Sequence, residues 1–260
     1  MKSTVNVSLA SWPGMRHEEA AAALLRSRPI EPVFGQLHIE HVQLVPQSFG
    51  ILSESLVDGL RAAHPTTRFR LHANVRVLPT HRQADFANFV GERLWFEQAA
   101  RIHRLLDAQA YTAHAGRRGR TGLSNLFDNA RRCADMFGSP VGIEGHYPTD
   151  DDRWLVSTWD EYRLLFESGV PYVIDLSHIG ILAASTGQRE ECLLKEMLAC
   201  ERCIEVHVSD NDGRSDQHRV CASAPWWLSA LSFVNEGAVV FSEGNHRVDS
   251  CTTLGVISDG

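Results

Sequence analysis

Short apolar segments alternate with longer segments of helical periodicity along most of the chain. The short segments predict eight β-strands, at residues 4–9, 36–42, 68–73, 108–114, 140–144, 171–175, 203–208 and 238–243. The longer segments predict helices at residues 17–27, 53–63, 85–106, 123–137, 158–169, 188–198 and 224–237. Such alternation is typical of repeated β–α units around a parallel sheet. We therefore expect one α/β domain over residues 1–260, folded as a (β/α)8 TIM barrel.

The end of the chain departs from this pattern. The segment after residue 243 is short and rich in residues that favour loops. We therefore expect the last helix of the barrel to be short or missing.

Composition and charge narrow the class of protein. The net charge is −7 with neutral histidines, whereas proteins that coat nucleic acid usually have a basic face, so nucleic acid is not an expected partner. No run of apolar residues is long enough to predict a membrane span, and no apolar leader opens the chain, so we expect a cytoplasmic protein. In that compartment the six cysteines should be free thiols.

Histidines and carboxylates recur where the predicted strands end, and in TIM barrels these ends surround the active site. The candidates are Glu40, His72, His114, Glu144, Asp175, His178, His207, Asp216, His218 and Glu243. Imidazole and carboxylate groups bind zinc, iron and manganese, and one catalytic ion takes about three or four protein ligands. A set this large predicts two or three metal ions that share carboxylates.

Other polar residues near these strand ends are candidates for substrate binding. Arg117, Arg118 and Arg120 lie in the loop after the fourth predicted strand. Arginine pairs with phosphate or carboxylate groups through two parallel hydrogen bonds, although a solvated loop is an equally good interpretation. Asn211 follows the seventh strand, where the turn-forming sequence SDNDG favours a role in the turn over one in substrate binding.

The order of the strand-end residues resembles the xylose-isomerase-like TIM-barrel superfamily over most of the chain. The ligand pattern of its endonuclease IV branch is matched in sequence order, including a DxxH pair (Asp175 and His178) and a DxH pair (Asp216 and His218). This resemblance implies a trinuclear zinc phosphodiesterase, in which the arginines assist at the phosphate.

The segment IEVHVSDNDGRSDQH, residues 204–218, is similar to the strand-seven region of the sugar isomerase and epimerase branch. That branch holds one divalent ion at the positions of Glu144, Asp175, His207 and Glu243. The resemblance implies that Glu144 and Glu243 transfer protons on a small sugar.

A third branch, the multinuclear non-heme iron oxidases that modify ribosomally made peptides, resembles other segments. These are LHIEH (37–41), RLHANVRV (70–77) and DQHRVCASAPWWLSAL (216–231). The resemblance implies two or three iron ions, O2 as oxidant, and a peptide substrate that a partner protein presents in some cases. We take this oxidoreductase as the first hypothesis, with Glu144, Glu243 and His207 as catalytic residues. The isomerase and the phosphodiesterase, with manganese or zinc, are the alternatives.

Overall fold

Eight parallel strands form a closed barrel in the computed structural model, which describes residues 4–80 and 82–247. The strands are β1 (Val5–Ser8), β4 (His38–Leu44), β5 (Arg68–His72), β6 (Tyr111–His114), β7 (Val141–Glu144), β8 (Tyr172–Asp175), β9 (Cys203–Val208) and β10 (Val239–Ser242). The barrel closes between its first and last strands, where Val5 pairs with Val240. The predicted (β/α)8 fold class is confirmed.

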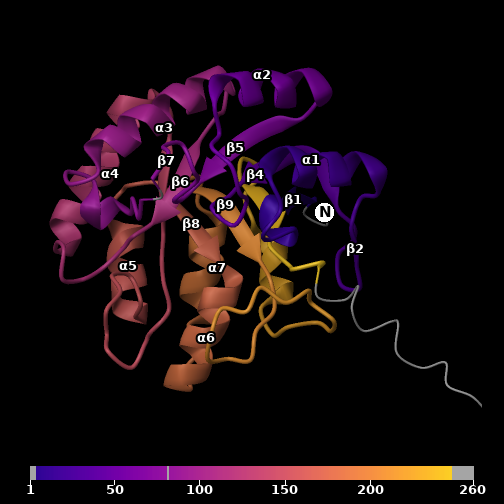
Figure 1. Cartoon of the computed structure of the whole chain (residues 1–260). Coiled ribbons are helices and arrows are strands. Elements are labelled where there is room, and N and C mark those ends of the chain that lie inside the picture. The colour runs from indigo at the N-terminus through magenta and orange to yellow at the C-terminus, as the bar shows by residue number, and fades with distance from the viewer. Residues whose placement is uncertain (1–3, 81, 248–260) are drawn as a thin grey trace, which may run out of the picture.

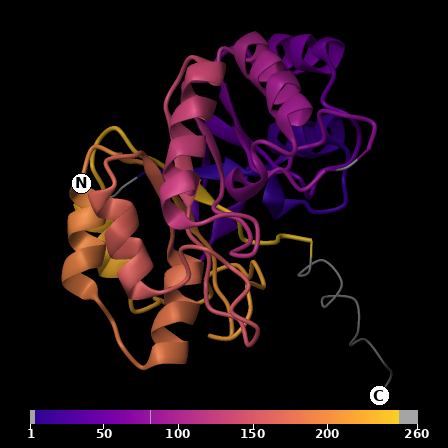
Figure 2. The ribbon, with the colours of Figure 1, turned by 90° about the vertical axis from the view of Figure 1, so that its left-hand side faces the viewer.

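Helices surround the strands, as Figures 1 and 2 show from two sides. They are α1 (His17–Arg26), α2 (Glu54–Ala63), α3 (Arg93–Leu105), α4 (Leu123–Phe137), α5 (Trp159–Glu167), α6 (Leu176–Thr186) and α7 (Glu191–Ala199). Shorter 3-10 helices are η1 (Leu9–Ser11), η2 (Phe86–Asn88) and η3 (Leu228–Phe233). Helices α2 and α5 have ordinary N-terminal caps. The hydroxyls of Ser53 and Thr158 accept the backbone N–H of Leu56 and Glu161, respectively.

A hairpin of β2 (Ile30–Glu31) and β3 (Gly35–Gln36) joins α1 to β4. Its Glu31 is buried and accepts hydrogen bonds from the Ser242 hydroxyl (2.5 Å) and from Nε2 of His246 (3.1 Å). The hairpin therefore lies against the last strand and the segment that follows it. No helix follows β10 in the described chain, which reaches Arg247. Within that same range, no helix is long and apolar enough to cross a membrane.

Some elements differ from the sequence-based expectation. The predicted helix at 85–106 is divided into η2 and α3 around Gly91, and the one at 224–237 shrinks to η3. Helix α6 was not predicted, because it is apolar on all sides and shows no helical periodicity. The second barrel strand runs from residue 38 to 44 rather than from 36 to 42. Each of its residues therefore lies closer to the start of the strand than the sequence predicted.

Candidate metal centre

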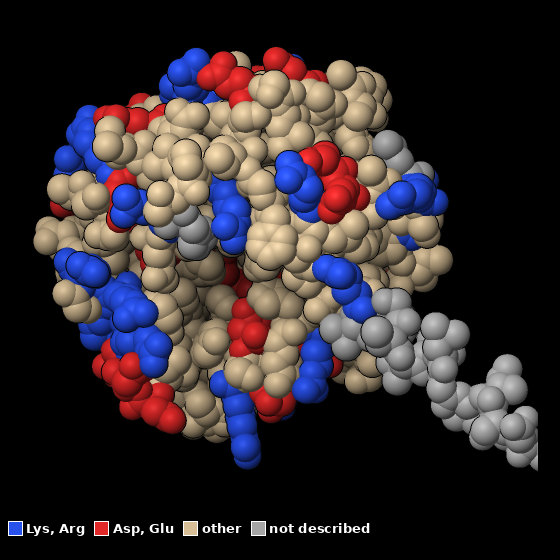
Figure 3. All heavy atoms as spheres, in the orientation of Figure 1, with Lys and Arg blue, Asp and Glu red and all other residues tan. Residues whose placement is uncertain are grey.

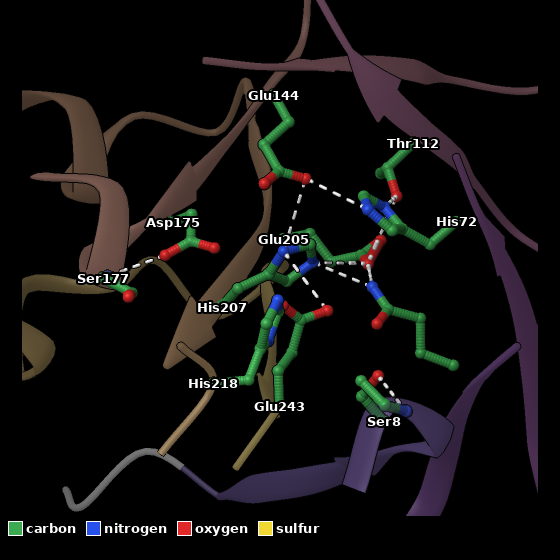
Figure 4. A network of polar contacts seen from close by, with 12 residues as sticks. Ser8, His72, Thr112, Glu144, Asp175, Ser177, Glu205, His207, His218 and Glu243 are labelled. Carbon is green, nitrogen blue, oxygen red and sulfur yellow. Dashed lines mark hydrogen bonds and ion pairs between the residues drawn. The ribbon is translucent and has the colours of Figure 1, made fainter. Parts of the chain in front are cut away.

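The structure gathers nine of the ten predicted metal ligands into one cluster at the carboxyl ends of the strands. Figure 4 shows part of this cluster, with His72, Glu144, Asp175, His207, His218 and Glu243 labelled. His72, His114, Glu144 and Asp175 each end a strand, and Glu243 directly follows one. The others are His178 on α6, His207 near the end of β9, and Asp216 and His218 in the loop after β9. The side chains of six of the nine are at most 6% exposed, so the cluster is largely shielded from bulk water.

Glu144 lies at the centre of this cluster. Its Oε2 is 3.2 Å from Nε2 of His72 and 3.4 Å from Nδ1 of His207. Its Oε1 is 3.5 Å from Nδ1 of His178 and 3.7 Å from Nε2 of His114. Two neighbouring ligands on an ion with bonds of about 2.1 Å lie roughly 3.0–3.4 Å apart. The distances around Glu144 are close to this spacing, so its carboxylate is well placed to bridge ions.

Asp216 forms a second point of contact. Its Oδ2 lies 2.9 Å from Nε2 of His218 and 3.4 Å from Nε2 of His178. The position of His178 depends on Asp175, because Oδ1 of Asp175 accepts the backbone N–H of Ser177 and of His178 and so starts helix α6. The other oxygen of Asp175 lies 3.7 Å from Nε2 of His178. One aspartate thus starts the helix and also faces the cluster.

Glu243 joins the two regions of the cluster. Its Oε1 lies 3.9 Å from Nδ1 of His207, and its Oε2 lies 3.5 Å from Nδ1 of His218. Three atoms of the cluster, Oε2 of Glu144 and the Nδ1 atoms of His207 and His218, are buried and make no hydrogen bond within the described chain. Buried polar atoms are rarely left in this state. Cations bound among these oxygen and nitrogen donors would satisfy them, so the residues present fit a metal centre.

The electrostatics of the cluster suit cations. Burial by itself would raise the pKa of Glu144, but the imidazoles of His114, His207 and His72 outweigh burial and hold that pKa well below its usual range. For His207 burial opposes the charged form, yet Glu243 and Glu144 raise the pKa well above its usual value. For His218 the hydrogen bond to Asp216 similarly overcomes burial and raises the pKa to about 9. The carboxylates therefore stabilise positive charge, which metal ions can supply instead of protons.

Sequence reasoning missed a buried carboxylate beneath the cluster. Glu205 in β9 is 0% exposed and lies 3.3 Å, through its Oε1, from Nε2 of His207. The same oxygen accepts a hydrogen bond from Nε2 of Gln43 at 2.8 Å, and Oε2 pairs with Arg70 at 3.3 Å. Alternation along the strand could have revealed Glu205, because residues two apart in a strand share a face.

His146, also missed, supports the wall of the site. Its ring stacks on that of His114 on one side (4.9 Å between centroids) and on Trp154 on the other (4.4 Å). The guanidinium of Arg117 lies over the Trp154 ring at 5.4 Å. This series of stacked groups fixes the plane of the His114 imidazole.

Glu40 lies outside the cluster, so the structure does not bring this predicted ligand together with the other nine. It lies near the start of its strand and lines a cavity with Thr4, Arg68 and Ala238, which come before or at the start of their own strands. That cavity is at the end of the barrel opposite the metal cluster. On the same strand, Gln43 extends toward His207.

Two of the four residues predicted to bind substrate are engaged inside the protein. The guanidinium of Arg118 bonds to Glu161, to Asp152 and to the carbonyl oxygen of Trp154. The amide of Asn211 donates to the hydroxyl and the carbonyl of Ser177, and its oxygen accepts the N–H of Gly213. Both side chains therefore fix loops rather than offer free groups to a substrate.

Arg117 and Arg120 are better placed for that role. They line a surface depression together with Arg82, Asp85 and Glu92. Both follow β6, the strand that ends in the cluster residue His114. Both residues therefore lie at the same end of the barrel as the cluster.

Solved structures of several activities have a similar fold. A D-tagatose 3-epimerase-like protein superposes with a TM-score of 0.67 at 16% identity, over 94% of this chain and 91% of that one. A family 2 AP endonuclease from Brucella melitensis gives 0.61 and 16%, over 94% of each chain. The IOLI protein, solved with a zinc atom, gives 0.61 and 13%, over 94% and 90%.

The chain has the xylose-isomerase-like barrel fold. No family model and no curated protein sequence matches it. Identities this low establish the fold alone, so the reaction must be argued from the site itself.

Proposed function

We propose that this barrel is an enzyme that hydrolyses phosphate esters with two or three divalent metal ions held in the cluster. The observation that carries the proposal is the contact of Asp216 with both His178 and His218. A single ion needs about three or four protein ligands, and Glu144, Asp175, His207 and Glu243 already supply that number. The remaining five residues would have no ion to bind in a mononuclear enzyme.

The contacts divide the cluster into three overlapping ligand groups. His72, His114 and Glu144 form the first, with ligand atoms all within 4.8 Å of one another. His72, His207 and Glu243 form the second, and Glu144, Asp175 and His178 form the third, so the groups share His72 and Glu144. His178 also contacts Asp216, which contacts His218. Ions bound there would supply a water of pKa near 7 and would neutralise charge on the phosphate oxygens.

The protein's own cationic groups support an anionic substrate. On the face seen in Figure 3 the surface is hollowed near its centre, with acidic side chains inside the hollow and lysine and arginine side chains around it. Loops after the strands carry Arg16, Arg76, Arg82, Arg117, Arg120, Arg153, Arg214, Arg219 and Arg247. Arg117 and Arg120 would bind phosphate oxygens through paired hydrogen bonds and orient the ester toward the cluster. The net charge of −7 favours a small ester over nucleic acid.

A sugar isomerase or epimerase is the second candidate, and one geometric observation favours it. Oε2 of Glu144 and Oε1 of Glu243 lie 3.4 and 3.9 Å from the same nitrogen, Nδ1 of His207. This arrangement suits one divalent ion between two carboxylates that could take and return a proton on a sugar. Several structures of similar fold are 3-epimerases, which adds weight to this candidate.

The iron oxidase with a peptide substrate, the first hypothesis from the sequence, gains no support from these structures. Histidine and carboxylate ligands suit iron as well as zinc or manganese, so the ligand set does not separate the metals. Metal content of protein purified without added metal tests this hypothesis, together with a search for a partner protein bound to the chain.

An assay of two substrate classes on two variants separates the hydrolase from the isomerase. The substrates are bis-p-nitrophenyl phosphate and a set of ketoses, each with Zn²⁺, Mn²⁺ or Fe²⁺. Metal-dependent phosphodiester cleavage that is lost in Asp216→Asn supports our proposal. Ketose epimerisation that survives in Asp216→Asn, with no phosphodiester cleavage, contradicts it and supports the isomerase. His64→Gln, a change at a buried histidine that caps α2, is the control for the folded state.

A further inference from the structure

A buried carboxylate beneath the cluster has no part in holding metal, yet it contacts one histidine of the cluster directly and a second through a threonine hydroxyl. Glu205 lies inside the barrel and faces Arg70, Gln43, Thr112 and His207. Placing a carboxylate in a protein interior is unfavourable unless its partners compensate for the lost hydration. An apolar side chain would fill the same space at no such cost, so a specific use of the charge is expected.

Two histidines of the cluster present opposite nitrogens to Glu144. His72 turns Nε2 toward Oε2 of Glu144 (3.2 Å), while its Nδ1 lies 2.9 Å from the hydroxyl of Thr112. His207 turns Nδ1 toward Glu144, while its Nε2 lies 3.3 Å from Glu205. A neutral imidazole that binds a cation through one nitrogen carries its hydrogen on the other, and that hydrogen needs an acceptor.

Glu205 can satisfy both hydrogens. It accepts Nε2–H of His207 directly. It also accepts the hydroxyl hydrogen of Thr112 (3.5 Å), which leaves the oxygen of Thr112 free to accept Nδ1–H of His72. We propose that Glu205 is a positioning residue that sets which nitrogen of His207 and of His72 binds metal. This inference rests on the proposed metal centre but not on the reaction catalysed there.

The groups around Glu205 hold it in place for this task. Arg70 binds Oε2 of Glu205 and the carbonyl oxygen of Ile204, so the carboxylate is fixed from below. Gln43 places its Nε2 at 2.8 Å from Oε1 of Glu205 and also at 2.8 Å from Nε2 of His207. The N–H that Gln43 donates holds Oε1 of Glu205 beside Nε2 of His207.

The test compares Glu205→Gln with wild type and with Glu31→Gln, a change at another buried carboxylate that contacts Ser242 and His246 instead of the cluster. Affinity for Zn²⁺ and Co²⁺ is measured by competition with a chromophoric chelator. Nitrogen shifts of ¹⁵N-labelled histidine report which ring nitrogens bind Zn²⁺. We expect Glu205→Gln to lose about 10- to 100-fold in affinity and to change the histidine spectrum, with Glu31→Gln unaffected.

Wild-type affinity and an unchanged histidine spectrum in Glu205→Gln would overturn the inference while leaving the proposed function intact. If wild type itself binds no metal, the proposed function fails first. Thr112→Val provides a second measurement in case Glu205→Gln does not fold. It removes only the hydroxyl that connects Glu205 to His72. We expect a smaller loss of affinity and an altered His72 signal, and unchanged values for both would again overturn the inference.

Discussion

Oδ2 of Asp216 lies 3.4 Å from Nε2 of His178, although 38 residues separate the two in the chain. The loop after β9 thus reaches the first turn of α6, and the cluster extends beyond the four residues that one ion would use. This contact is the structural basis for a multinuclear centre.

Replacing Asp216 with Asn should separate this part of the cluster from the rest. The amide keeps the size of the side chain but loses the charge that raises the pKa of His178 and His218 and that would bind a cation. We expect one fewer ion per chain and a loss of phosphodiesterase kcat/KM of about 100-fold, or about 2.7 kcal/mol. Steady-state kinetics and metal analysis check this prediction. Asp135→Asn, at an exposed position of α4, should keep both values.

The end of each strand was the most reliable signal in the sequence. A parallel barrel brings the carboxyl ends of its strands to one rim, so residues such as His72, His114 and Glu144 could be grouped without any structure. Glu40 lies outside the cluster because its strand continues to Leu44, which places Glu40 near the start of the strand instead of at its end. Glu205 was not predicted as a site residue because it lies inside the barrel, below the strand ends. The sequence also could not show that the guanidinium of Arg118 pairs with Glu161, because that contact joins segments far apart in the chain.

Arg117 and Arg120 should contribute to binding rather than to the chemical step. Replacing either with Ala removes a cation from this end of the barrel and leaves every cluster residue in place, and for Arg117 it also removes the contact with the Trp154 ring. We expect KM for a phosphate ester to rise about tenfold with kcat nearly constant, since a charge-assisted hydrogen bond contributes about 1.5–3 kcal/mol. The increase should shrink at high salt. Arg28→Ala, at an exposed site before the β2–β3 hairpin, should leave KM unchanged, and an equal rise there would contradict the assignment.

His103 should make the fold sensitive to acid. Burial in α3, followed by the charges of Arg104 and Arg70, lowers the pKa of its imidazole to about 4, while in the unfolded chain it stays near 6.5. Between these values the unfolded chain binds the extra proton, so the free energy of unfolding falls as pH drops from 6.5 to 4. The slope from this group approaches about 1.4 kcal/mol per pH unit.

Urea unfolding of the protein, freed of metal with a chelator, at a series of pH values tests this slope. His103→Gln keeps a polar partner for Ser139, which lies 2.8 Å from Nε2 of the histidine, but removes the titration. The variant should lose less stability than wild type between pH 6.5 and 4. Parallel curves for the two proteins would show that His103 is not buried in its neutral form.

The number of metal ions per chain tests the central claim most directly. Wild-type protein loaded with Zn²⁺ or Mn²⁺ and freed of loosely held metal should contain two or three ions per chain by inductively coupled plasma mass spectrometry. His178→Ala should contain fewer. One ion per chain in wild type, unchanged in His178→Ala, would contradict the multinuclear centre on which the proposed function rests.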